Sequence, residues 1–183
     1  EIMYHPVSGS KDDEYIEIFN RSTTNINIGG WKIKGGIGFT FPPNTILAPD
    51  AYLVVARDIN RLRSNYAILN LTNSIGNFSG RLSHAGERVA LRMPDTITST
   101  NAQGIVSTNY VNIAVHDVTY QTGGRWGQWA DGGGSSLELI NPNVNARFAP
   151  NWADSDETMK SSWVNVETTG QLMHGANYES GVL

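Results

Sequence analysis

The stretch GGWKIK, residues 29–34, decides the fold class of this chain. Trp31 and Ile33 alternate with two lysines, and a period of two is typical of a β-strand with one face buried and the other in water. The glycine pair before the tryptophan allows a sharp turn into this strand, because glycine adopts positive φ without a steric clash. We therefore expect Trp31 to pack in the core of a β-sheet and not to serve as an exposed ligand platform.

Further strand patterns lie on both sides of this stretch, and turn residues separate them at short intervals. They are YIEIF (15–19), FTF (39–41), AYLVVA (51–56), RVALRM (88–93), VNIAVHDVTY (111–120) and SSLELI (135–140). In the fifth segment the apolar phase slips between Val115 and Val118, which predicts a β-bulge. Short, closely spaced strands favour an all-β sandwich or barrel over alternating strands and helices.

The in-phase apolar side chains of these segments form the predicted core. They are Ile16, Ile18, Trp31, Ile33, Phe41, Leu53, Val55, Val89, Leu91, Leu137 and Leu139. Asp58 is placed to cap a short helix over residues 59–66. Residues 64–80 and 95–109 are rich in Asn, Ser and Thr, and we interpret both as polar loops.

Composition excludes several classes of protein. The chain has 183 residues, of which 39% are hydrophobic and 16% charged, as expected for one globular domain with a real core. Its net charge of −4 and its lack of a Lys/Arg stripe make nucleic-acid binding unlikely. It contains no cysteine, so disulfides and thiolate metal sites are excluded. No run of residues is long and apolar enough to predict a membrane span.

The ordered set of segments resembles the lamin tail domain family, in its bacterial form. The resemblance rests on EIMYHP (1–6), DEYIEIFN (13–20), INIGGWKIKGGIGFTFP (26–42), TILAPDAYLVVARD (45–58), FSGRLSHAGERVALRMPD (78–95), VTYQ (118–121) and SSLELINPN (135–143). It implies an immunoglobulin-like antiparallel β-sandwich with long loops, one short helix and a wrapped C-terminal tail. We expect a single domain over 1–183, with its core at about 1–141 and an extension, 142–183, docked on that core.

The resemblance also implies a role and a location. We expect a non-catalytic interaction or anchoring module that binds protein partners or neighbouring domains of a larger bacterial protein. That protein would be secreted or held at the cell surface, so the module would lie outside the cell or in the cell envelope. No signal peptide is visible, and we interpret the chain as a fragment of a longer precursor.

The densest acidic cluster is Asp12, Asp13 and Glu14, with Glu17 nearby. Its functional interpretation is a calcium site, and the alternative that we favour is a solvated hairpin loop. Alternating strand positions send Glu14 and Glu17 to opposite faces, and the spacing does not match an EF-hand. Calcium is thus the one cofactor considered, and otherwise no cofactor is expected.

Tryptophans form the second candidate site. Trp126 and Trp129 lie in the glycine-flanked segment GRWGQWADGGG, and Trp152 lies in the C-terminal part of the chain. Exposed aromatic rings on a β-sandwich can stack on sugars, so a polysaccharide- or cell-wall-binding module is one alternative function. We favour the interpretation that these rings fix the C-terminal part of the chain against the sheet.

The histidines give no recognisable catalytic or metal motif. His5, His84, His116 and His174 are widely separated in the sequence and show no zinc-ligand spacing. An enzyme would need several of these imidazoles to converge with acidic residues in a cleft, and the sequence gives no reason to expect that. We therefore predict no catalytic residue, and a nucleic-acid-binding accessory domain stays the weakest alternative.

Overall fold

The computed structural model describes residues 1–156, 172–174 and 177–179 of the chain. These residues form an immunoglobulin-like β-sandwich built from two large sheets, which confirms the predicted fold class. The first sheet contains, in spatial order, β13 (Trp152–Asp154), β12 (Leu137–Leu139), β1 (Ile2–Met3), β2 (Tyr15–Phe19), β7 (Tyr52–Ala56) and β8 (Ser74–Gly76). The second contains β11 (Val106–Tyr120), β10 (Glu87–Thr100), β4 (Lys32–Gly35), β5 (Ile37–Thr40) and β9 (Ser79–Gly80).

Strand pairing in both sheets is antiparallel, except that β7 and β8 run parallel. Two shorter pairs complete the described strands, β3 (Ile26–Asn27) with β6 (Ile46–Leu47) and β14 (Leu172–His174) with β15 (Asn177–Glu179). Because β13 joins the first sheet, part of the predicted C-terminal extension belongs to the sandwich itself. Of the predicted wrapped tail, residues 157–171, 175–176 and 180–183 lie outside the described residues.

The glycine pair of the opening stretch turns the chain into β4. Gly30 has a φ of +81° and donates its N–H to the carbonyl oxygen of Phe41 at 2.9 Å. A β-carbon on Gly29 would lie 2.7 Å from the backbone nitrogen of Asn44, so a side chain there would force the backbone apart. This tight turn places Trp31 next to the core, where its ring is half-buried against the buried cluster.

Apolar side chains of both sheets meet in one core. Among the predicted positions, the buried side chains are Ile16, Ile33, Phe41, Leu53, Val55, Val89 and Leu137, and the partly buried ones that pack against them are Ile18, Trp31, Leu91 and Leu139. A second, smaller cluster lies under α1 (Ile59–Asn65), the one α-helix in the described part of the chain. The predicted cap is confirmed, because the Asp58 side chain accepts a hydrogen bond from the Arg61 N–H at 3.0 Å.

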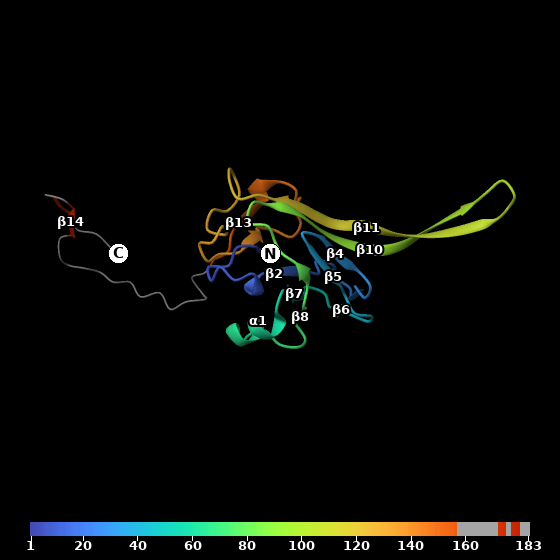
Figure 1. Ribbon diagram of the computed structural model, residues 1–183, viewed down its shortest axis with the longest axis horizontal. Helices are drawn as coiled ribbons and strands as arrows, with labels where there is room; N and C mark the ends of the chain where they lie inside the picture. The colour runs from blue at the N-terminus through green and yellow to red at the C-terminus, as the bar shows by residue number, and fades with distance from the viewer. Residues whose placement is uncertain (157–171, 175–176, 180–183) are drawn as a thin grey trace.

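The interpretation of residues 95–109 as a polar loop is wrong. Strands β10 and β11 continue through this segment as one long hairpin that extends far beyond the other strands (Figure 1). The predicted bulge is confirmed at the base of this hairpin. Leu91 pairs with His116 and Arg92 with Ala114, so Val115 has no partner on β10.

Residues 64–80 also contain more regular structure than a polar loop. The segment holds the end of α1 and the short strands β8 and β9, which add one strand to each large sheet. Two 3₁₀ turns, η1 (Lys11–Asp13) and η2 (Ala149–Asn151), complete the described elements. In the described part of the chain, no helix has the length and hydropathy that crossing a membrane requires.

Candidate functional site

The acidic cluster at η1 is engaged by the protein itself. The Arg61 guanidinium donates two hydrogen bonds to the Asp13 carboxylate, at 2.6 Å and 2.8 Å, and this contact lowers the pKa of Asp13. Glu14 points into the molecule, where it accepts a hydrogen bond from the Leu82 N–H at 2.8 Å. Asp12 lies 3.9 Å from the Arg57 Nε. The three carboxylates thus face different partners, and the described residues contain no group of three or more His, Asp or Glu placed to hold a metal ion.

Two of the three candidate tryptophans lie in the core. Trp126 and Trp152 are buried, with their ring centroids 6.3 Å apart, and the Trp152 Nε1–H donates to the carbonyl oxygen of Ala146 at 2.7 Å. Trp129 is 66% exposed. A single exposed ring does not make the row of stacking platforms that a long polysaccharide needs, so these residues do not favour a carbohydrate-binding module.

The structure brings together two histidines that lie far apart in the sequence. The rings of His5 and His84 stack with centroids 3.8 Å apart, and the His5 Nδ1 lies 2.7 Å from the Asp131 carboxylate. Partial burial, the neighbouring His5 and the Arg81 charge lower the pKa of His84. Sequence spacing does not predict this pair, because the contact joins the segment that follows β1 to the turn that precedes β10. The side chain of His174 lies outside the described residues.

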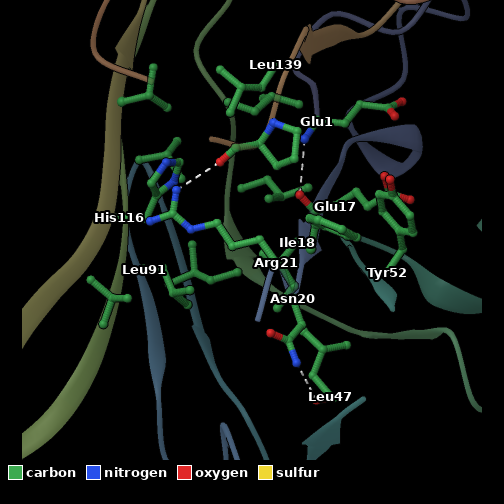
Figure 2. A pocket seen from close by; sticks show the side chains of 18 of the residues that line it. Glu1, Glu17, Ile18, Asn20, Arg21, Leu47, Tyr52, Leu91, His116 and Leu139 are labelled. Atoms are coloured by element: carbon green, nitrogen blue, oxygen red, sulfur yellow. Dashed lines mark hydrogen bonds between the residues drawn. The ribbon is translucent and has the colours of Figure 1, made fainter. Parts of the chain in front are cut away.

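An apolar cavity of about 370 Å³ opens between the two sheets (Figure 2). Both sheets contribute side chains to its wall, among them Ile18, Trp31, Leu91, Val115 and Leu139. Trp31 thus packs against the core on one side and lines this cavity on the other. The cavity is chiefly apolar, so it can accept apolar side chains or an apolar small molecule.

Polar groups gather at one end of the cavity. The Arg21 guanidinium donates to the carbonyl oxygen of Pro142 at 3.0 Å, and His116 lies beside it (Figure 2). Partial burial, followed by the Arg21 charge, lowers the pKa of His116. His116 and Val115 stand at the base of the long hairpin, so the cavity wall continues into that hairpin.

We call residues 93–114 the arm; it comprises the outer parts of β10 and β11 and the turn that joins them. Beyond Arg92, β10 no longer pairs with β4, so the arm is a two-stranded ribbon with solvent on both faces. Five of its large apolar side chains are exposed: Ile97, Ile105, Val106, Tyr110 and Ile113. Tyr110 is the extreme case, with 87% of its surface accessible.

The two faces of the arm differ in chemistry. One face continues the core-facing side of Val89 and Leu91, and its cross-strand pairs include Met93 with Ile113 and Asp95 with Val111. The opposite face is rich in threonine, and its pairs are Thr96 with Tyr110, Thr98 with Thr108 and Thr100 with Val106. The arm therefore offers one face of mixed apolar and polar side chains, one face of β-branched and aromatic side chains, and two exposed edges.

Charge is almost absent from the arm. Asp95 is the one charged residue between positions 93 and 114. Exposed edge strands are normally protected by charged side chains, proline or bulges, because a bare edge can pair with another chain. The outer edge of β11 has none of these between Val106 and Ala114. Sequence reasoning missed this surface because the segment was taken for a loop; the run of Thr, Ile, Val and Tyr was the signal that could have identified it.

Comparison with protein families gives one result. The family model described as Lamin Tail Domain matches residues 1–159, which include the whole sandwich and the arm. A search of curated proteins finds no match to the chain. The match agrees with the resemblance inferred from the ordered strand segments.

Proposed function

Because the chain belongs to the lamin tail domain family, an immunoglobulin-like module, we propose that it is a non-catalytic interaction module that binds a protein partner through the arm. We further propose that it serves a larger bacterial protein that is secreted or held at the cell surface. The location rests on the family resemblance alone. A separate protein and a neighbouring domain of the same chain both fit as partner, since both offer peptide backbone and apolar side chains.

The arm is the observation that supports this proposal. The arm is a hairpin that exposes five large apolar residues and carries one charged residue. Exposed apolar patches of this kind are typical of sites that bind another protein. The arm can add a strand of another protein to its edge, where backbone hydrogen bonds give affinity and alternate side chains give specificity. The arm carries no lysine or arginine, so it lacks the cations that a nucleic-acid backbone requires.

Photo-cross-linking in the producing cells tests the proposal. A benzophenone side chain replaces Tyr110 on the arm in one variant and Tyr52 in the other. Both tyrosines are exposed, and Tyr52 lies on β7, remote from the arm. The two changes are therefore matched in residue type, and both side chains reach solvent, Tyr110 with 87% and Tyr52 with 55% of its surface exposed.

We expect a discrete covalent protein adduct from the Tyr110 variant and none from the Tyr52 variant. Equal labelling at the two positions, or no adduct from the arm, would contradict the proposal. The mass of the adduct also separates a different protein from a second copy of the same chain.

A further inference from the structure

We propose that the arm pairs with the arm of a second copy of this chain, edge to edge along β11, about a twofold axis. This inference rests on the proposed function, because it names the partner of the same surface. The pairing joins two hairpins into a continuous four-stranded antiparallel sheet that bridges two sandwiches.

The outer edge of β11 is free to form such a pairing. Among the described strands, β11 pairs only with β10, and it forms the outermost strand of its sheet. Between Val106 and Ala114 it lies beyond the body of the sandwich, since Ala114 pairs with Arg92, the last residue of β10 that contacts β4. Half of the backbone N–H and C=O groups in this stretch point away from β10, as an edge strand requires.

The lack of charge on the β11 edge is compatible with pairing to a second copy. A twofold interface brings the same patch of two copies together, so a net charge on that patch would face a patch of the same charge. Residues 106–114 contain no charged side chain, whereas the whole chain has a net charge of −4. The arm is thus a surface on which two copies can meet without electrostatic repulsion between the contacting strands.

The length and symmetry of the edge also fit self-pairing. In an antiparallel twofold arrangement centred on Tyr110, this residue lies opposite its counterpart, and Thr108 lies opposite Asn112 of the other copy. Two exposed tyrosine rings then cover each other at the axis, and aromatic cross-strand pairs are favourable. The most exposed ring of the arm is in this way removed from water.

Sedimentation velocity of the full 183-residue chain, over concentrations from micromolar to submillimolar, tests the pairing. We expect a concentration-dependent dimer of the 20.0 kDa chain. The double variant Thr108→Lys/Asn112→Lys places lysines opposite lysines across the axis. We expect it to raise the dissociation constant at least ~100-fold, because juxtaposed like charges are strongly repulsive at an interface.

The matched control is Thr96→Lys/Thr98→Lys, which puts two lysines on the same face of the arm but on β10. These charges lie one strand away from the proposed edge, so we expect the dissociation constant to change less than about threefold at physiological salt. If both double variants dissociate the dimer equally, the faces of the arm and not the β11 edge form the contact, and the inference is wrong.

Disulfide trapping supplies an independent readout, because the chain contains no cysteine of its own. Directly opposed residues of antiparallel strands have Cα atoms about 4.5–5.5 Å apart, within the range that a disulfide spans. With Tyr110 on the twofold axis, this residue faces its own counterpart, so we expect a single cysteine at Tyr110 to link two copies on oxidation. We expect Thr98→Cys, on β10, to leave the chain monomeric on a non-reducing gel.

A chain that sediments as a monomer throughout, or that forms no disulfide from a cysteine at Tyr110, would overturn self-pairing. Photo-cross-linking of Tyr110 to a different protein, together with a monomer in solution, would overturn self-pairing and leave the proposed interaction function intact. The absence of any adduct at the arm would instead count against the proposed function itself.

Discussion

Glu14 is a carboxyl group with no accessible surface in the described structure. Its Oε2 accepts a hydrogen bond from the Leu82 N–H, while its Oε1 has no hydrogen-bond partner among the described residues and lies 3.8 Å from the Arg81 Nε. Burial raises the pKa of Glu14 to about 7, against the lowering effect of the Leu82 N–H and the Arg81 charge. Folding therefore favours the protonated carboxyl.

This pKa shift predicts a pH dependence of stability. The folded-state pKa lies above the unfolded one, so the stabilisation is fully present below the usual glutamate pKa and is lost as the pH rises through about 7. Glu14→Gln keeps the shape of the side chain and cannot ionise. Between pH 5 and pH 8 we expect the wild-type free energy of unfolding to fall by about 1–3 kcal/mol relative to this variant, measured by urea denaturation.

Glu138→Gln is the control for this experiment, because it removes an exposed carboxylate on β12. We expect it to keep the wild-type pH dependence. If Glu14→Gln also keeps that dependence, the Glu14 carboxyl is not responsible for it.

The burial of Glu14 could be predicted from the sequence, but its hydrogen-bond partner could not. Glu14, Ile16 and Ile18 are spaced two residues apart, and such residues of a strand lie on the same face of the sheet. This spacing predicts that Glu14 faces the core. The clustering with Asp12 and Asp13 favoured a solvated loop instead. The hydrogen bond to Leu82 joins segments 68 residues apart, and a periodic pattern carries no information on such contacts.

At the scale of elements, the arm extends from the sandwich and contributes little to its core. We predict that replacing residues 95–111 by Asn-Gly, so that Pro94 and Asn112 close a tight hairpin, leaves the body folded. The free energy of unfolding should change by less than about 1 kcal/mol, because the removed side chains are mostly exposed. Thermal and urea denaturation followed by circular dichroism measure this change.

The same trimmed variant should lose dimerisation, because the proposed β11 edge is removed. A trimmed chain that fails to fold would show that the arm supports the sandwich, contrary to this prediction. Retention of the dimer by a folded trimmed chain would place the interface elsewhere on the molecule.

The arm shows why an exposed hairpin is hard to predict. Where a sheet has one buried face, apolar and polar residues alternate, as in RVAL (88–91), and the pattern predicts a strand. The arm has solvent on both faces, so this alternation fades and Thr, Ser and Asn occur at many positions. The abundance of β-branched and aromatic residues is then the one remaining indication of a strand, and β-propensity alone predicts strands weakly.

For the whole molecule, sequence patterns predicted the sandwich, the core positions and the bulge, because each depends on local periodicity. They did not predict the order of strands in the sheets, the His5–His84 stack or the cavity beside Trp31. These features depend on contacts between distant segments. The family match over residues 1–159 agrees with the periodic pattern, and the arm and the cavity come from the structure alone.

The two large sheets bury their apolar faces against each other, so we predict that they unfold as one cooperative unit. Val55→Ala on β7 and Val89→Ala on β10 remove the same buried methyl groups from opposite sheets. Each should lower the free energy of unfolding by roughly 1.5–3 kcal/mol and keep a single transition, seen alike by circular dichroism and tryptophan fluorescence. Val106→Ala, on the exposed arm, is the matched control and should change it by less than about 0.5 kcal/mol. Separate transitions for the two probes, in either core variant, would show instead that each sheet has a stability of its own.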